Sequence, residues 1–317
     1  MPTSSVPTTD EPLEPTVWET ERETAREPGD EKLYARGVSI GITMGYAISS
    51  LGESIGTVLD EPILIAGIGI TWLISTIAYM ALTSIPFVGM FLALVVWIVP
   101  AFALAGTLAM AAEGIRGSPS FDHLIEGLEE YWQRMVGAFA VLFVGYMVLM
   151  FAITIAIVLL VLFGIVGADL SAGADPAVGS ALGIGFVLVM AAIVLVVAAI
   201  GIAIQFFDAA IVVGDVGVID SFKTSLSVAR SNPISVVGYT ILRGILAYVP
   251  VVLAVLAAVA GGVVGGMMMS EDIAFLAAFA FAFLVFVVAA PVVWTVLSVY
   301  HVSYFTRASG LREHSRL

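Results

Sequence analysis

Long stretches of the chain contain apolar residues and no charged residue. One lies between Glu61 and Glu113, and another between Arg134 and Asp169. A helix needs about 20 mostly apolar residues to cross a bilayer, and its backbone groups must pair within the segment. The first stretch is long enough for two spans, with a break at residues 83–86. The pattern predicts an all-α polytopic integral membrane protein with about six transmembrane helices, near residues 62–82, 86–110, 136–166, 180–207, 236–264 and 273–305.

A different pattern, one apolar stripe on a polar helix, occurs at residues 217–238. The stripe consists of Ile219, Phe222, Leu226 and Ala229, at helical spacing. Pro233 disfavours helical geometry at Asn232, so one helix should end there and the next begin. A short amphipathic helix joined to an apolar span is expected to lie in the membrane surface. A polar loop with one helical turn is the alternative.

Two weaker copies of this plan precede it, at residues 118–137 and 40–67. In the second copy Ser120-Phe121 aligns with Ser221-Phe222, and in the first the Glu61-Pro62 junction resembles Asn232-Pro233. We interpret the chain as three units, each with one amphipathic helix followed by two spans. Internal repeats of this kind are common in transporters, although the low identity leaves coincidence as the alternative.

The two ends of the chain have a different composition. Residues 1–35 are rich in acids and prolines and cannot bury enough apolar surface to offset the entropy lost on ordering. They are predicted to form a disordered acidic cytoplasmic tail, or alternatively a partner-binding segment anchored by Trp18. The helical membrane domain is expected at 36–306, and residues 307–317 form a cytoplasmic C-terminal tail.

The basic residues predict the orientation of the spans. Arg116 and Arg134 lie in the loop after span 2, and Lys223 and Arg230 lie in the loop after span 4, while the opposite loops contain no basic residue. Basic residues mark cytoplasmic loops. We therefore expect a multi-pass protein of the cell membrane with both termini and the three amphipathic helices on the cytoplasmic side. Its expected partners are the lipid bilayer and, on that face, other proteins; no nucleic acid is expected.

The overall charge bears on habitat. The chain has 25 acidic and 12 basic residues, for a net charge of −13. Lys32 and Lys223 are its lysines. Excess carboxylate with little lysine is typical of salt-adapted proteins, which suggests a halophilic archaeon; an acidic protein from a mesophile is the alternative.

Motifs for chemistry are weak. The absence of cysteine excludes disulfides, thiol catalysis and cysteine-ligated metals. Residues 52–56 match GxSxG, but that motif needs a strand before Ser54 and a helix after it. His123, His301 and His314 lack ligand-spaced partners, and His301 is interpreted as part of an aromatic belt. The sequence therefore predicts no enzyme and no catalytic residue, cofactor or metal site.

Polar residues within or beside the spans are the remaining candidates for a site. They are Gln205 and Asp208 at the end of span 4, Asn232 at the helix junction, and Arg243 in span 5. An ionisable residue at membrane depth is costly and is by default a hypothesis of function. Here a structural Asp208–Arg243 pair, or snorkelling to water, is favoured over a transport site.

These residues also carry a family resemblance. The series Phe206-Phe207-Asp208, Asp215, Ser221-Phe222, Ser225 and Ser231-Asn232-Pro233 resembles the signature of uncharacterised haloarchaeal multi-pass membrane proteins. These are similar to the membrane domain attached to some glycerophosphodiester phosphodiesterases. The resemblance implies an all-helical membrane fold. It implies no catalytic residues, because the soluble phosphodiesterase domain is absent.

Two classes of function remain. The first is a noncatalytic scaffold, anchor or regulator that acts through the cytoplasmic helices and tail. The second is a transporter or lipid-handling protein that acts through the helix bundle. The lack of charge at mid-membrane favours the first, and an intramembrane enzyme is third because no nucleophile is paired with a base.

Overall fold

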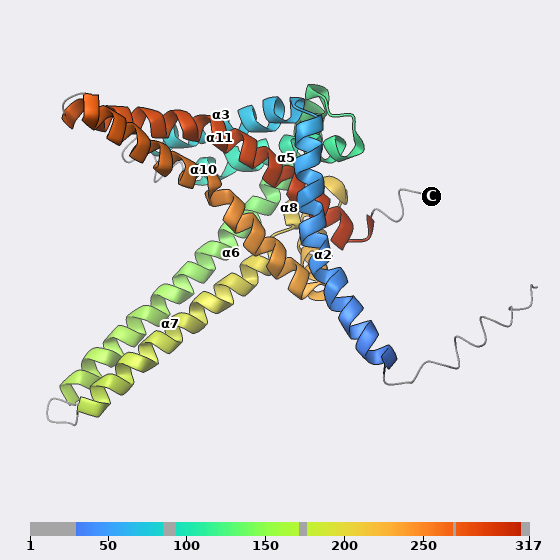
Figure 1. The fold of residues 1–317 in the computed structure, drawn as a ribbon. Coiled ribbons are helices and arrows are strands. Elements are labelled where there is room, and N and C mark those ends of the chain that lie inside the picture. The colour runs from blue at the N-terminus through green and yellow to red at the C-terminus, as the bar shows by residue number, and fades with distance from the viewer. Residues whose placement is uncertain (1–29, 85–92, 171–175, 269–270, 312–317) are drawn as a thin grey trace, which may run out of the picture. The chain divides into compact units, whose positions relative to one another are not determined.

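The structure is a computed structural model of the chain, and it describes residues 30–84, 93–170, 176–268 and 271–311. In these ranges the regular elements are all helices (Figure 1). They are α2 (Asp30–Asp60), the π-helical turn η1 (Ile65–Gly69), α3 (Ile70–Thr83), α5 (Ala93–Arg116), α6 (Phe121–Leu170), α7 (Pro176–Ile204), α8 (Phe207–Val213), α9 (Val218–Ser231), α10 (Pro233–Met268) and α11 (Glu271–Ala308).

Six helical segments in the described ranges are long and apolar enough to cross a membrane. They are Ile65–Thr83, Ile98–Arg116, Phe121–Leu159, Ile184–Val213, Pro233–Met267 and Ile273–Ala308. Their outer faces are apolar: Phe151, Leu195 and Phe275 are 69%, 69% and 73% exposed. Apolar surface of this extent is covered by lipid rather than by water. The predicted all-α membrane fold with about six spans is confirmed.

The chain divides into two compact units, Met1–Thr43 and Met44–Leu317. Most of the expected disordered tail, residues 1–29, lies outside the described residues. Residues 30–35 belong to α2, and the tail boundary at residue 35 stays a prediction. At the other end α11 stops at Ala308, and residues 312–317 of the expected C-terminal tail lie outside the described part.

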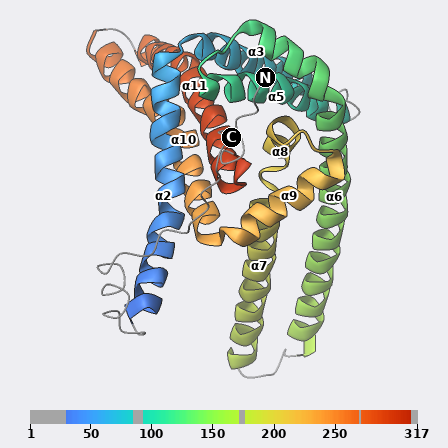
Figure 2. The same ribbon diagram turned by 90° about the vertical axis from the view of Figure 1, so that its right-hand side faces the viewer.

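The three amphipathic segments differ in form. The last is the separate helix α9, which Figure 2 shows crossing from α8 to the start of α10. The first is the end of α2, which stops at Asp60 before Pro62. The second is continuous with its span in α6, because residues 129–136 contain no proline to break it. The prediction of three separate surface helices is therefore wrong for the second copy.

The fourth predicted span, near residues 180–207, ends in a break, and a further short helix follows it. Helix α7 ends at Ile204, and α8 begins at Phe207. Ser225 on α9 holds this break: its hydroxyl donates to the Ala203 carbonyl at 2.9 Å and accepts from the Phe206 N–H at 3.0 Å. These two bonds satisfy backbone groups that the interrupted helix leaves open. The break turns α8 into the centre of the bundle, where six of its residues are buried.

Glycines bring the other helices close together. A Cβ on Gly265 of α10 would lie 2.7 Å from Ala274 Cα of α11, and one on Gly261 would lie 3.0 Å from the Ala277 carbonyl oxygen. Small residues allow such backbone approach in membranes. Helices α10 and α11 therefore pack closely within one chain. A Cβ on Gly69 in η1 would lie 2.8 Å from Pro291 Cβ, which joins η1 to α11 in the same way.

Candidate functional site

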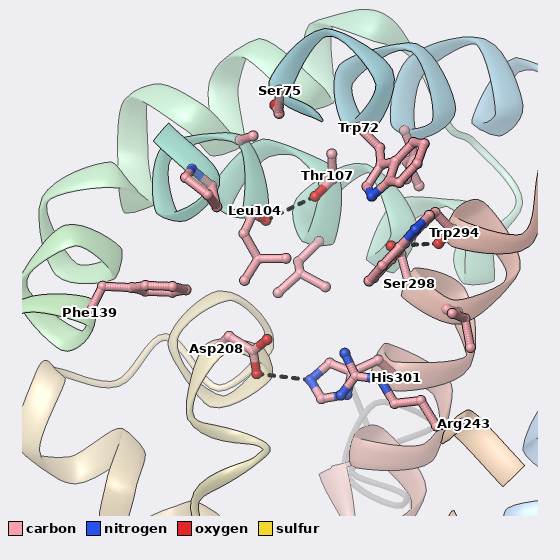
Figure 3. A pocket seen from close by; sticks show the side chains of 15 residues that line it. Trp72, Ser75, Leu104, Thr107, Phe139, Asp208, Arg243, Trp294, Ser298 and His301 are labelled. Atoms are coloured by element: carbon pink, nitrogen blue, oxygen red, sulfur yellow. Dashed lines mark hydrogen bonds and ion pairs between the residues drawn. The ribbon is translucent and has the colours of Figure 1, made fainter. Parts of the chain in front are cut away.

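A cavity of about 290 Å³ lies among six helices of the bundle (Figure 3). Its walls come from η1 and α3, α5, α6, α8, α10 and α11. The lining residues are Ile68, Trp72, Ser75, Pro100, Ala103, Leu104, Thr107, Leu108, Phe139, Asp208, Arg243, Trp294, Leu297, Ser298 and His301. Ligand cavities in proteins are about 300–1,000 Å³ and mostly apolar with a few polar groups. This cavity has a similar lining, and its volume lies just below that range.

Irregular backbone shapes the wall opposite the charged residues. The π-turn η1 leads directly into the turn of α3 that carries Trp72, and π-turns interrupt regular helix packing. In α5, Pro100 lies inside the helix and lines the cavity. Proline removes one hydrogen bond from the helix and displaces its backbone. Both irregularities occur beside the cavity.

The apolar wall is aromatic and aliphatic. The rings of Trp72 and Trp294 are stacked, with centroids 5.6 Å apart and planes at 24°. The hydroxyls of Ser75, Thr107 and Ser298 donate to carbonyls of their own helices. Each hydroxyl oxygen keeps acceptor capacity. This wall therefore suits an apolar group and offers few polar contacts.

The polar end contains a chain of hydrogen bonds built from three helices. His301 Nε2 on α11 lies 2.8 Å from Asp208 Oδ1 on α8, and His301 Nδ1 lies 2.5 Å from the Tyr239 hydroxyl on α10. A neutral imidazole with its proton on Nε2 satisfies both contacts, because Nε2 then donates to the carboxylate and Nδ1 accepts from the phenol. Asp208 Oδ1 also accepts from the Ala209 N–H at 2.9 Å.

Aromatic packing holds His301 in this position. Its ring stacks on Phe206, with centroids 5.4 Å apart. Phe206 also stacks on Tyr304, and Tyr304 stacks on Tyr239 at 4.5 Å. His301, Phe206, Tyr239 and Tyr304 are all at most 1% exposed. The rings that fix the imidazole come from three places. They are Phe206 in the break between α7 and α8, Tyr239 on α10 and Tyr304 on α11.

Arg243 completes the polar end. It lies on α10 one helical turn after Tyr239, lines the cavity, and is close enough to Asp208 and Tyr239 to interact electrostatically with both. Figure 3 shows Asp208, His301 and Arg243 together at one end of the cavity and Ser75 and Trp72 at the other. In the part of the chain that the structure describes, Arg243 forms no ion pair.

Two of the four candidate polar residues meet in the cavity, and two do not. Asp208 and Arg243 both line it, but the direct partner of Asp208 is His301, so the expected Asp208–Arg243 pair is wrong. Snorkelling is also wrong for Asp208, which is 7% exposed. Gln205 instead donates to the Thr240 hydroxyl at 3.0 Å, and Asn232 donates to the Ala308 carbonyl at 3.4 Å. These two tie helix ends together away from the cavity.

Two residues of the polar end, Tyr239 and His301, were not among the predicted site residues. The interpretation of His301 as an aromatic-belt residue is wrong, because its ring is fully enclosed. A signal existed in the spacing: Tyr239 precedes Arg243 by four residues and therefore shares its helix face. His301 gave no local signal, because its partners are far away in the chain.

Other chemistry has little support among the described residues. No group of three or more His, Asp or Glu side chains there is arranged to hold a metal ion. Ser54, the serine of the GxSxG stretch, lies within α2 and donates its hydroxyl to the Ser50 carbonyl at 2.6 Å. Its proton is therefore engaged within its own helix.

These features define a helical membrane protein with a ligand-sized cavity inside its bundle. Residues 46–308 match the family described as a domain of unknown function, DUF7847, and the chain belongs to that family. All residues of the cavity lie within the matched range. Comparison with curated proteins and with solved structures gave no match.

Proposed function

We propose that this protein binds a small amphiphilic ligand in the cavity between its helices, and that it acts as a transporter or lipid-handling protein. One observation carries the proposal: an apolar chamber of about 290 Å³ ends on Asp208, His301 and Arg243, which come from three different helices. Polar groups in membrane helices are costly and mark ligand paths. A purely structural bundle would gain more from filling this space with apolar side chains.

The proposed role is noncatalytic and needs no cofactor. The hydrogen-bond chain contains a phenol, an imidazole and a carboxylate but no serine, threonine or cysteine nucleophile. We also propose that both termini face the cytoplasm in the cell membrane, because the basic residues lie in loops on one side. We propose in addition that the chain is related to the membrane domains of glycerophosphodiester phosphodiesterases. Its acidic composition supports the proposal that it comes from a halophilic archaeon.

The test compares ligand retention in two tryptophan variants. The protein would be released from membranes into nanodiscs and its bound small molecules measured by native mass spectrometry. Leu104→Trp places a large ring in the cavity, whereas Leu195→Trp places it on the lipid-facing side of α7, where Leu195 is 69% exposed. We expect the wild type and Leu195→Trp to retain a small molecule that Leu104→Trp loses. Equal retention by all three proteins would contradict the proposal.

A second role, as a scaffold or regulator of protein partners on the cytoplasmic face, is supported by α9. Ile219 on this helix is 58% exposed, while Ser221 and Ser225 are buried against the bundle. Part of the apolar stripe, which was expected to lie in the membrane surface, therefore points away from the helix bundle. A spin label at Ile219→Cys, in a chain without other cysteines, would report its surroundings. Contact with lipid would assign the stripe to the membrane surface, and contact with water would leave it open to a partner.

A further inference from the structure

We infer that the ligand carries an anionic headgroup, a phosphate or a carboxylate, and that Arg243 binds it. This inference rests on the proposed function, because it names the ligand class of the same cavity. It starts from the charges at the polar end: one guanidinium, one carboxylate and one imidazole.

Arg243 has a positive charge without a direct counterion. Its guanidinium stays protonated in proteins, and the residue lies ten positions after Pro233, about 15 Å along α10. A charge at such a position is stable when it faces a polar cavity or pairs with another charge. Among the described residues it has no ion-pair partner. The cavity that it lines is therefore the place where a counterion would bind.

Asp208 carries the opposite charge but makes no direct ion pair with Arg243. Its Oδ1 accepts hydrogen bonds from His301 Nε2 at 2.8 Å and from the Ala209 N–H at 2.9 Å. The carboxylate is directed to these donors and offsets the charge of Arg243 at longer range. The guanidinium keeps N–H donors in a planar fork, which matches two oxygens of a phosphate or carboxylate.

The rest of the cavity limits the apolar part of the ligand. The stacked Trp72 and Trp294 and the side chains of Leu104 and Phe139 suit an alkyl or aromatic group. A volume of about 290 Å³ accommodates one short chain rather than two full acyl chains. Two sources fit this chemistry: a soluble amphiphilic anion, or the headgroup region of an anionic lipid.

The test uses probes with one tail and different headgroups. The full chain in phosphatidylcholine nanodiscs would be titrated with octyl phosphate, octanoate, octanol and octyltrimethylammonium, with binding followed by native mass spectrometry. We expect the two anions to bind at least tenfold more tightly than octanol, and the cation to bind no better than octanol. Equal binding of octanol or the cation would overturn the inference, even if the variants of Arg243 fail to fold.

Three variants locate the binding charge. Arg243→Gln should weaken octyl phosphate at least tenfold, whereas Arg243→Lys should keep part of the affinity as a point charge. Arg230→Gln, at an exposed position on α9 outside the cavity lining, should change nothing. Unchanged anion binding in a folded Arg243→Gln protein would overturn the assignment to Arg243.

Two further measurements separate the outcomes. If no probe binds the wild type, or if Leu104→Trp binds all probes normally, the proposed cavity function fails as a whole. If probes bind in the cavity without preference for anions, the function stands and the inference fails.

Displacement of octyl phosphate by inorganic phosphate alone would identify a soluble anion. Displacement only on changing the nanodisc lipid to phosphatidylglycerol would identify a lipid headgroup; either result supports an anionic ligand.

Discussion

His301 and Asp208 meet with 2.8 Å between Nε2 and Oδ1, although 93 residues separate them in the chain. The contact joins α11 to the short helix α8 and places both side chains at the polar end of the cavity. Because both residues are buried, loss of either one leaves a polar atom of the other without its partner at this contact. The stability of the bundle and the chemistry of the cavity are therefore linked through one pair.

Removal of either partner should destabilise the protein. Asp208→Ala leaves the buried His301 donor without an acceptor, and we expect a loss of about 2–3 kcal/mol in unfolding free energy. His301→Ala should cost a similar amount. The double variant should cost less than the sum, because the same bond is lost once. Thermal and denaturant unfolding of the purified protein measures all three, and strictly additive losses would contradict a direct pair.

Two neighbouring tyrosines provide a matched comparison. Tyr239 bonds His301, whereas the Tyr300 hydroxyl is buried and has no hydrogen-bond partner among the described residues. Tyr239→Phe should cost about 1–2 kcal/mol because His301 Nδ1 loses its donor. Tyr300→Phe should be neutral or slightly stabilising, because it removes an unsatisfied group. Unfolding measurements would count against the hydrogen-bond chain if the two variants behaved alike.

Ser225 should be required for the break between α7 and α8. Ser225→Ala removes bonds to the Ala203 carbonyl and the Phe206 N–H, and we expect a loss of about 1–3 kcal/mol. Ser227→Ala, on the exposed side of the same helix, should change stability by less than about 0.5 kcal/mol. A Ser225→Ala protein as stable as the Ser227→Ala control would show that other contacts hold the break.

Adjacent glycines on α10 should respond in opposite directions to alanine. At Gly265 a Cβ would lie 2.7 Å from the Ala274 backbone, whereas at Gly266 none of the described residues would lie within 4 Å of it. Gly265→Ala should force α10 and α11 apart and cost about 1–3 kcal/mol. Gly266→Ala should be neutral or gain up to about 1 kcal/mol from helix propensity. Thermal stability of the two variants, measured side by side, would contradict this packing if Gly266→Ala were the more damaging.

The cysteine-free chain allows a direct test of orientation. Ser227→Cys on α9 and Ser84→Cys after α3 are both exposed. With both termini in the cytoplasm, a membrane-impermeant maleimide added to intact cells should label position 84 and not position 227. Labelling of position 227 in intact cells, without permeabilisation, would reverse the proposed orientation.

The sequence predicted what depends on local pattern. Apolar runs indicated six spans because lipid requires every backbone group to pair within its segment. Pro233 correctly marked the break between α9 and α10. The end of the fourth span was predicted near residue 207, close to the end of α7 at Ile204. The short buried helix α8 was not predicted, because the break before it contains no proline and depends on Ser225 from a later helix.

The sequence also predicted only those site residues that stand out in the local pattern. Asp208 and Arg243 stood out because charges are rare in apolar spans, and both line the cavity. The direct partner of Asp208 could not be inferred, since its contact with His301 depends on how α8 and α11 pack. Trp72 gave no signal at all, because one aromatic residue in a span is ordinary and its stacking on Trp294 is tertiary.

Photocrosslinking in native membranes would test the cavity most directly. An octyl phosphate analogue with a diazirine at the end of its tail would be activated, and the labelled peptides mapped by mass spectrometry. We expect labels on α3, α5 and α11 beside Trp72, Leu104 and Trp294, and their loss in excess octyl phosphate or in Leu104→Trp. Labelling confined to the exposed faces of α6 and α7, with no protection by excess ligand, would contradict a binding site inside the bundle.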